Sequence, residues 1–158
     1  MGTHLTEKER ELLVLCIIKE CLSYAKEYDK TFEEVLNEDV FANIVNVEFA
    51  ETVCKTIEAL KNKGYINGTV EIEYEIEIDP KTFEEETIDA IDFSLCTFED
   101  ITISLKGNMK LGMEGFKEVS RDFAQKAVPV IKCIGTTALQ TCVEVTVTAG
   151  LKAAGMPI

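Results

Sequence analysis

The sequence predicts an α+β fold, and three patterns carry that prediction. Apolar residues recur at helical spacing in three stretches between residues 6 and 60. Strict alternation of apolar and polar residues then runs from Thr69 to Asp79, which is typical of a half-buried strand. The segment 123–158 is apolar and carries little charge. We therefore expect one domain over residues 5–122 and an apolar tail over residues 123–158.

The first predicted helix spans about residues 6–28. Thr6 is a suitable N-cap, and acids at positions 7 and 9 favour the first turn. Apolar residues at helical spacing then define one buried face. The polar side chains should form a solvated face: Lys8, Arg10, Glu11, Lys19, Glu20, Lys26 and Glu27.

Two shorter helices should follow. Thr31 and Glu34 match a capping box, which predicts a short helix that ends near Asn37, before a turn at Glu38–Asp39. A third helix is predicted over residues 48–60, with a C-terminal stop at Gly64. The apolar face of this helix consists of Phe49, Val53, Ile57 and Leu60.

The alternating run after the third helix predicts the outgoing strand of a β-hairpin. Its apolar face consists of Val70, Ile72, Tyr74, Ile76 and Ile78, and glutamates occupy the other face. Pro80 should end the strand, and the acidic residues 84–89 should form a loop or a short helix at the tip. A returning strand is expected over 101–105, followed by a helix over about 108–126.

The passage from the third helix into the strand resembles a known family. Leu60 is followed four residues later by Gly64-Tyr65-Ile66, which is similar to the way in which winged helices leave their third helix. Residues 106–111 are similar to the pattern with which the last wing strand enters a closing helix, although Lys106 stands where threonine is usual. Over residues 5–120 the chain resembles small winged-helix proteins of phages and other mobile elements of Gram-positive bacteria. Many of those proteins have no assigned activity, so the resemblance implies a fold and no functional residues.

The charge of the chain argues against the usual winged-helix function. The sequence has 29 acidic and 16 basic side chains and a formal net charge of −13. Such a charge repels nucleic acids and anionic lipid surfaces. The imbalance is uneven, because residues 123–158 hold three lysines and one glutamate, a net of +2, so the preceding residues carry −15.

The glutamates of the hairpin allow two interpretations. They are either the solvated face of a hairpin, or an anionic surface that binds a basic partner or imitates nucleic acid. The residues concerned are Glu71, Glu73, Glu75, Glu77, Glu84, Glu85 and Glu86. In the alternative in which the protein binds DNA, the third helix would offer Lys55, Lys61 and Lys63, but acids stand at its N-terminal end.

The tail is expected to mediate self-association. A heptad-like stripe favours a helix that packs against a partner, whereas alternation over residues 143–148 favours a strand. The stripe consists of Ile131, Ile134, Ala138, Val145 and Ala149. Lys132, Glu144 and Lys152 interrupt the tail, so we expect no membrane span.

The sequence offers no catalytic or metal-binding motif. His4 is the only histidine, which removes serine–histidine, cysteine–histidine and histidine-rich zinc arrangements from consideration. The six cysteines lie in apolar runs without a Cys-x-x-Cys pair or a secretory leader, as expected of reduced thiols in the cytoplasm. Pairs of carboxylates are expected by chance in so acidic a chain. We expect no cofactor.

These observations favour a non-enzymatic regulatory or protein-interaction protein. It would form homo-oligomers through its tail and bind a partner with a basic surface through its acidic face. One form of this hypothesis is an inhibitor of a nucleic-acid-binding host or defence protein, which only the charge supports. The alternative hypothesis is a dimeric DNA-binding transcriptional regulator, and it rests on fold alone.

Overall fold

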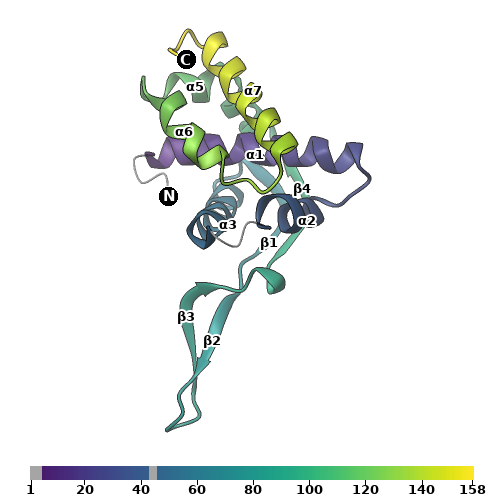
Figure 1. Ribbon diagram of the computed structural model, residues 1–158, viewed down its shortest axis with the longest axis vertical. Coiled ribbons are helices and arrows are strands. Elements are labelled where there is room, and N and C mark those ends of the chain that lie inside the picture. Colours follow the sequence, from purple (N-terminus) through teal and green to yellow (C-terminus); the bar gives the residue numbers. More distant parts are fainter. Residues whose placement is uncertain (1–4, 43–45) are drawn as a thin grey trace.

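The computed structural model describes residues 5–42 and 46–158 and divides into a body and an arm (Figure 1). The body contains helices and a two-stranded antiparallel sheet, and a second two-stranded sheet projects from it as the arm. The α+β class predicted from the sequence is confirmed. His4 lies outside the described residues. Within the described part of the chain, no helix is both long and apolar enough to cross a membrane.

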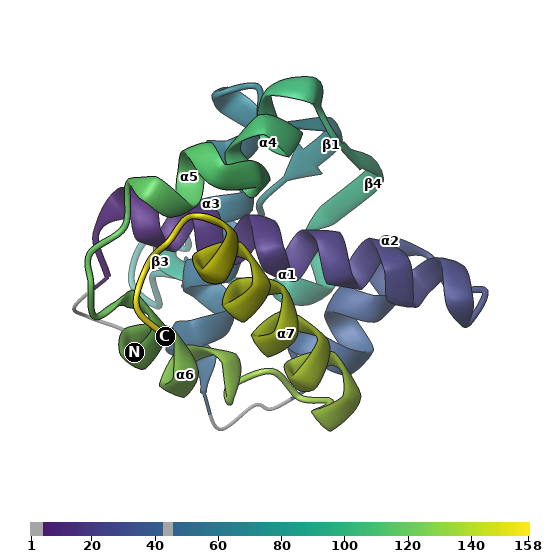
Figure 2. The same cartoon turned by 90° about the horizontal axis from the view of Figure 1, so that it is seen from above.

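Helix α1 (Glu7–Glu27) is the central element of the body. It begins as predicted, with a capping box in which Thr6 and Glu9 exchange hydrogen bonds. Seven consecutive residues from Leu12 to Ile18 are buried, because α1 is packed between helices on several sides (Figure 2). The predicted solvated face is therefore wrong at Glu11, which is buried where Lys63 lies over it.

Helix α2 (Phe32–Val35) starts at the predicted capping box of Thr31 and Glu34. It continues into a π-helical turn, Leu36–Val40, so the predicted turn at Glu38–Asp39 is wrong. Asp39 is buried and accepts a hydrogen bond of 2.8 Å from the Thr136 hydroxyl. This contact joins the second helical segment to the tail.

Helix α3 (Val47–Asn62) confirms the third predicted helix. The Asn46 side chain caps its first turn by accepting a hydrogen bond from the Phe49 amide. Beyond its end, Gly64 has a φ of +81°, a conformation that glycine adopts without strain. The chain then enters the first strand directly.

Strand β1 (Ile66–Glu71) pairs antiparallel with β4 (Thr97–Ile103). The predicted returning strand is confirmed, but it begins earlier than expected. The single strand predicted from Thr69 to Asp79 is wrong, because it is interrupted after Glu71. Its second half, β2 (Tyr74–Ile78), belongs to a different sheet.

Strand β2 pairs antiparallel with β3 (Glu85–Ile91), where the sequence predicted a loop or a short helix. A 3-10 turn, Phe93–Leu95, separates β3 from β4. The Phe93 ring packs against Phe41 with ring centroids 5.4 Å apart. This contact anchors the base of the second hairpin to the body, and the rest of the hairpin extends away from it (Figure 1).

The predicted helix over residues 108–126 is wrong as one continuous element. The structure has α4 (Leu105–Met109), a π-helical turn at Lys110–Glu114, α5 (Gly115–Lys117) and then, after a break, α6 (Phe123–Ile131). Gly112 has a ψ of −159° within the π-helical turn, which bends the chain there. The bends allow these short helices to follow the surface of α1.

The tail is helical, as one of the two interpretations predicted, and the strand over 143–148 is wrong. Helix α7 (Thr137–Ala153) packs along α1 through one buried face. That face consists of Leu139, Val143, Val147 and Leu151. Residues 123–158 thus share one hydrophobic core with the residues before them.

Candidate protein-interaction surfaces

The arm consists of β2, β3 and the turn that joins them. It stands away from the body, and its tip lies at the opposite end of the long axis from α6 and α7 (Figure 1). Residues 71–86, from the end of β1 to the second residue of β3, contain eight acids and one lysine, a net charge of −7. All the predicted acidic residues are exposed: Glu71, Glu73, Glu75, Glu77, Glu84, Glu85 and Glu86.

The acids of the arm are not neutralised within the chain. Glu77 lies directly opposite Glu86 in the β2–β3 register, an arrangement in which like charges repel. Among residues 5–42 and 46–158, none of the exposed glutamates of the arm forms an ion pair. The negative charge of the arm is therefore available to a partner.

The arm also exposes apolar side chains. Ile76 is 60% exposed and Ile78 is 58% exposed, so the predicted burial of this apolar face is wrong for the outer part of the hairpin. Alternation predicts that a strand has an apolar face, but burial requires a second layer, and no helix of the described chain covers the arm. The result is a ribbon that exposes Glu77 and Glu86 on one face and the two isoleucines on the other, where Glu85 lies opposite Ile78.

Phe83, at the tip of the arm, is a residue that the sequence patterns did not single out. It is 80% exposed and has a φ of +57°, a left-handed conformation that is costly for a bulky residue. Two backbone hydrogen bonds hold this turn: the Phe83 amide donates to the Asp79 carbonyl, and the Asp79 amide donates to the Glu84 carbonyl. An aromatic residue between Pro80 and three consecutive glutamates was the only available signal.

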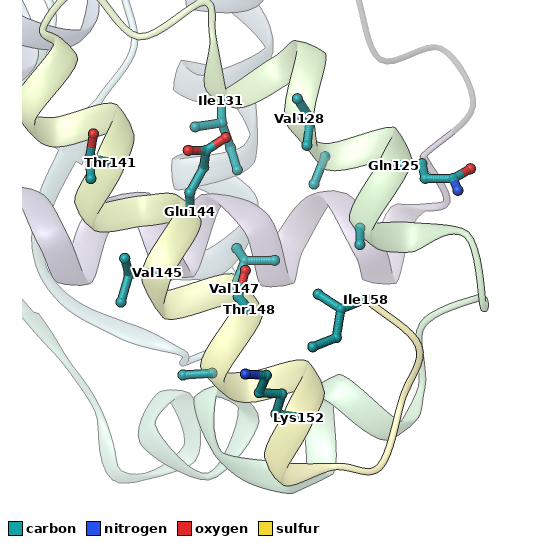
Figure 3. A pocket seen from close by; sticks show the side chains of 13 residues that line it. Gln125, Val128, Ile131, Thr141, Glu144, Val145, Val147, Thr148, Lys152 and Ile158 are labelled. Atoms are coloured by element: carbon teal, nitrogen blue, oxygen red, sulfur yellow. The ribbon is translucent and has the colours of Figure 1, made fainter.

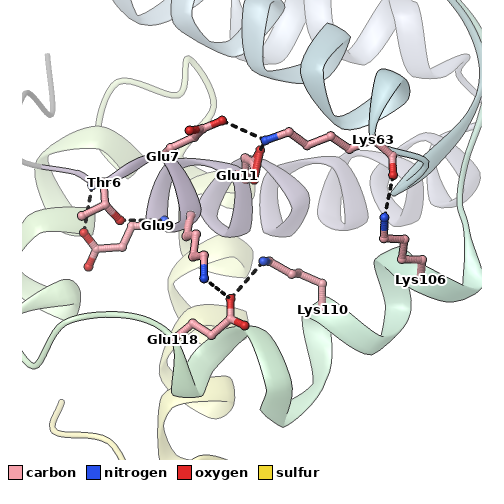
Figure 4. A network of polar contacts seen from close by, with 9 residues as sticks. Thr6, Glu7, Glu9, Glu11, Lys63, Lys106, Lys110 and Glu118 are labelled. Atoms are coloured by element: carbon pink, nitrogen blue, oxygen red, sulfur yellow. Dashed lines mark hydrogen bonds and ion pairs between the residues drawn. The ribbon is translucent and has the colours of Figure 1, made fainter.

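The candidate DNA-binding lysines lie on or just beyond α3, and one of them is already neutralised. Lys63 donates to Glu7 at 2.8 Å and to Glu11 at 2.6 Å (Figure 4). These hydrogen bonds, first that to Glu11, raise the pKa of Lys63. Lys55 is exposed and Lys61 is half-buried. The three lysines therefore do not form a set of unpaired cations for a phosphate backbone.

Charges of the body are paired in a second group around Glu9, which is 1% exposed. Its carboxylate accepts hydrogen bonds from Lys126 at 2.7 Å and from the Ser120 hydroxyl at 2.6 Å. Burial alone would raise the pKa of Glu9, but the hydrogen bonds from Lys126, Ser120 and the Thr6 amide lower it to about 2. This group joins the start of α1 to α6 and is a structural contact.

The predicted self-association stripe is divided by the fold. Ile131 and Ile134 are buried and do not continue the exposed face of α7, because the chain leaves the helical conformation between α6 and α7. Ala138, Val145 and Ala149 are exposed on the outer face of α7. Val145 and Ala149 line a groove of about 690 Å³ between α6 and α7, and Ile131 forms part of its floor (Figure 3).

Four of the six thiols are buried and do not form a reactive site. Cys16, Cys21, Cys54 and Cys96 are buried, and burial raises the pKa of each, that of Cys16 to about 12. Thiols with a raised pKa are poor nucleophiles and poor metal ligands. Within the described residues, no three side chains of the types that bind metals gather at one place.

We compared the chain with models of protein families, with curated proteins and with solved structures, and none of them matches it.

Proposed function

We propose that this protein is a non-enzymatic interaction protein whose arm binds a protein partner with a basic surface. In this proposal the body is a winged-helix-like scaffold, and the arm is a long form of its wing. The observation that carries the proposal is the combination of unpaired acids and exposed apolar side chains on one ribbon that projects from the body.

Each component of the arm has a distinct role in binding. The net charge of −7 attracts a basic partner over long distances and speeds association. Charge alone gives little affinity, and the apolar side chains supply it when they leave water. Phe83 is placed to act as the anchor, because large aromatic residues that enter a pocket dominate many interfaces.

The chemistry of the arm favours a partner that itself binds nucleic acid. A nucleic-acid-binding surface is basic and is often lined with aromatic and apolar groups that contact bases. A ribbon that exposes both acids and apolar side chains would compete for such a surface. The protein would then act as an inhibitor, which agrees with the resemblance to proteins of phages and mobile elements.

The alternative, direct DNA binding by a dimer, finds less support in the geometry. Lys63 is engaged by Glu7 and Glu11, and the acidic arm takes the place of the wing that would approach the DNA backbone. Both proposals can be separated by one series of measurements.

The test is affinity capture from a bacterial lysate with the full chain as bait, with and without nuclease treatment. A first variant removes three arm charges: Glu75→Gln, Glu77→Gln and Glu86→Gln. A matched control removes three exposed charges of the body: Glu27→Gln, Asp29→Asn and Glu114→Gln. A third variant, Phe83→Ser, removes the apolar anchor.

We expect the full chain to capture a protein that stays bound after nuclease treatment. The control variant should capture the same protein, and the arm variants should not. With the partner purified, its affinity should fall as salt rises for the full chain, and less steeply for the charge-neutralised arm. Retention that survives every arm variant would refute the proposal. Retention that nuclease abolishes, with a mobility shift that depends on Lys55 and Lys61, would instead establish DNA binding.

A further inference from the structure

Helix α7 has an outer face that no segment within residues 5–42 and 46–158 covers. Its inner face packs on α1, whereas the outer residues recur with spacings of three and four, as in a helix that packs on another helix. Val145, in the middle of this face, is 62% exposed. The outer residues are Ala138, Thr141, Val145, Thr148 and Lys152.

The groove beside this face is apolar and open. It lies between α6 and α7, has a volume of about 690 Å³ and is lined on the α6 side by Val128 and Ile131 (Figure 3). The residues that α7 contributes are short, so another helix could approach closely and place its own side chains in the groove.

Two opposite charges border the groove. Glu144 lies beside Ile131, and Lys152 lies at the other end, near Ile158 (Figure 3). Neither has an ion-pair partner within the part of the chain that the structure describes. The two residues are eight positions apart, which corresponds to about 12 Å along a helix.

We propose that the groove binds helix α7 of a second copy of this chain, with the two α7 helices antiparallel about a two-fold axis near Thr148. Glu144 and Lys152 are each four residues from Thr148. In this arrangement Glu144 of each copy faces Lys152 of the other, so the face is complementary to itself. Val145 of each copy then enters the groove of the other. A parallel arrangement would instead place identical charges side by side.

The charge distribution of the whole chain favours a second copy at this place. Two molecules with a net charge of −13 repel one another over most of their surfaces. Residues 123–158 carry a net charge of +2, so repulsion between copies is weakest where α6 and α7 meet. The arm lies at the far end of the molecule and remains free in such a dimer (Figure 1). This inference therefore does not depend on the function proposed for the arm.

The first measurement is the mass of the full chain in solution by analytical ultracentrifugation over a range of concentrations. We expect a dimer that Val145→Asp converts to a monomer, because an unpaired carboxylate would have to enter the apolar groove. The control is Val47→Asp, which places the same charge on α3, where Val47 is also exposed. Both variants should keep the helix content of the original chain, measured by circular dichroism, since neither valine is buried.

Charge exchange tests the orientation. Glu144→Lys and Lys152→Glu should each weaken the dimer about tenfold, because each places like charges together twice. A mixture of the two single variants should form a heterodimer as stable as the original dimer, and so should the double variant with itself. A full chain that is monomeric at all concentrations would overturn the proposal. A dimer that resists Val145→Asp, or single variants that do not pair in the mixture, would overturn it equally.

Discussion

The body and the arm use the same kind of charged residue in opposite ways. In the body, Glu9 and Glu11 are buried and each is held by a lysine at 2.7 Å or less. In the arm, Glu77 lies opposite Glu86, and no cation of the described residues forms an ion pair with either of them. The comparison teaches that acidic composition does not define a role. The surroundings of each carboxylate decide whether it stabilises the fold or is available to a partner.

The apolar residues show the same contrast. Leu12 to Ile18 in α1 are buried on all sides, whereas Ile76, Ile78 and Phe83 in the arm are exposed. Burial of an apolar side chain stabilises a fold by about 1.5–3 kcal/mol. The body gains this free energy from its own core, and the arm gains it only when another molecule covers it. In the function that we propose, stability and binding thus depend on different ends of the molecule.

The largest expected effect is on the paired acid of the body. Glu9→Gln should reduce the free energy of unfolding by about 3 kcal/mol, because it removes the buried negative charge that Lys126 contacts at 2.7 Å. Asp122, 3.5 Å from Lys126, is mostly exposed to solvent and does not replace that contact. Chemical denaturation followed by circular dichroism measures this change. Glu77→Gln in the arm is the matched substitution and should leave the stability of the body unchanged. Equal losses in both variants would contradict the division between body and arm.

The same residue predicts a pH dependence. The pKa of Glu9 is about 2 in the folded chain, below its ordinary value, so its contribution is complete at neutral pH. That contribution should be lost as the pH falls from about 5 towards 2, where the folded form must take up a proton. The free energy of unfolding, measured by chemical denaturation between pH 7 and pH 3, should decrease less with falling pH for Glu9→Gln than for the original chain. The same decrease in both chains would show that the hydrogen bonds of Glu9 do not lower its pKa in the folded chain.

A smaller effect is expected from packing between α5 and α7. A Cβ added at Gly150 would lie 2.3 Å from the Phe116 ring, which is buried. Gly150→Ala should therefore destabilise the body by about 1–3 kcal/mol, despite the better helix propensity of alanine. Gly112→Ala is the control, because a Cβ there meets no atom within 4 Å. A stabilised Gly150→Ala variant would mean that α7 packs less closely on the preceding helices.

Relief of repulsion in the arm should produce a smaller change. Glu77→Lys would place a lysine opposite Glu86 and convert a repulsive pair into an attractive one. Hydrogen exchange of the β2 and β3 amides should slow by about twofold to fivefold, with the larger factor at low salt. Amides of α1 serve as the internal reference and should not change. Unchanged exchange in the arm would show that the glutamates lie too far apart to repel.

Removal of the outer arm should have the smallest effect on the body. Tyr74 and Ile91 are partners across β2 and β3, so an Asn-Gly turn between them can replace residues 75–90. We expect the shortened chain to melt at nearly the same temperature as the full chain and to keep the same number of copies per particle in solution. It should lose the partner captured through the arm. A large drop in melting temperature would show that the arm is part of the folding unit.

Local signals predicted much of the body correctly. Thr6 and Thr31 begin helices as their capping boxes predict, and Gly64 ends α3 in a left-handed conformation. These features depend on residues within one helical turn, so they can be predicted from local residue patterns. The exposed glutamates of the hairpin could also be identified from alternation alone.

The errors concern contacts between distant residues. The alternating run after Gly68 predicts one strand, but its two halves belong to different sheets, β1–β4 and β2–β3. The contact between Phe93 and Phe41 holds the base of the β2–β3 hairpin at the body, and the hairpin extends away from the β1–β4 sheet (Figure 1). Glu11 was expected in solvent and is buried beneath Lys63, which is 52 residues away in the sequence. A pattern within one helix or strand cannot predict a contact between residues so far apart in the sequence.

Local patterns in the sequence predict the class of the fold, the starts of α1 and α2, the end of α3 and the acidic surface of the arm. The three-dimensional arrangement of the elements determines which carboxylates are paired, which apolar residues are covered and where the tail lies. The physical reason is that hydrogen bonding within a helix or strand is local, whereas burial and ion pairing depend on elements brought together by folding. The groove beside α7 and the exposed Phe83 became visible only when those elements were in place.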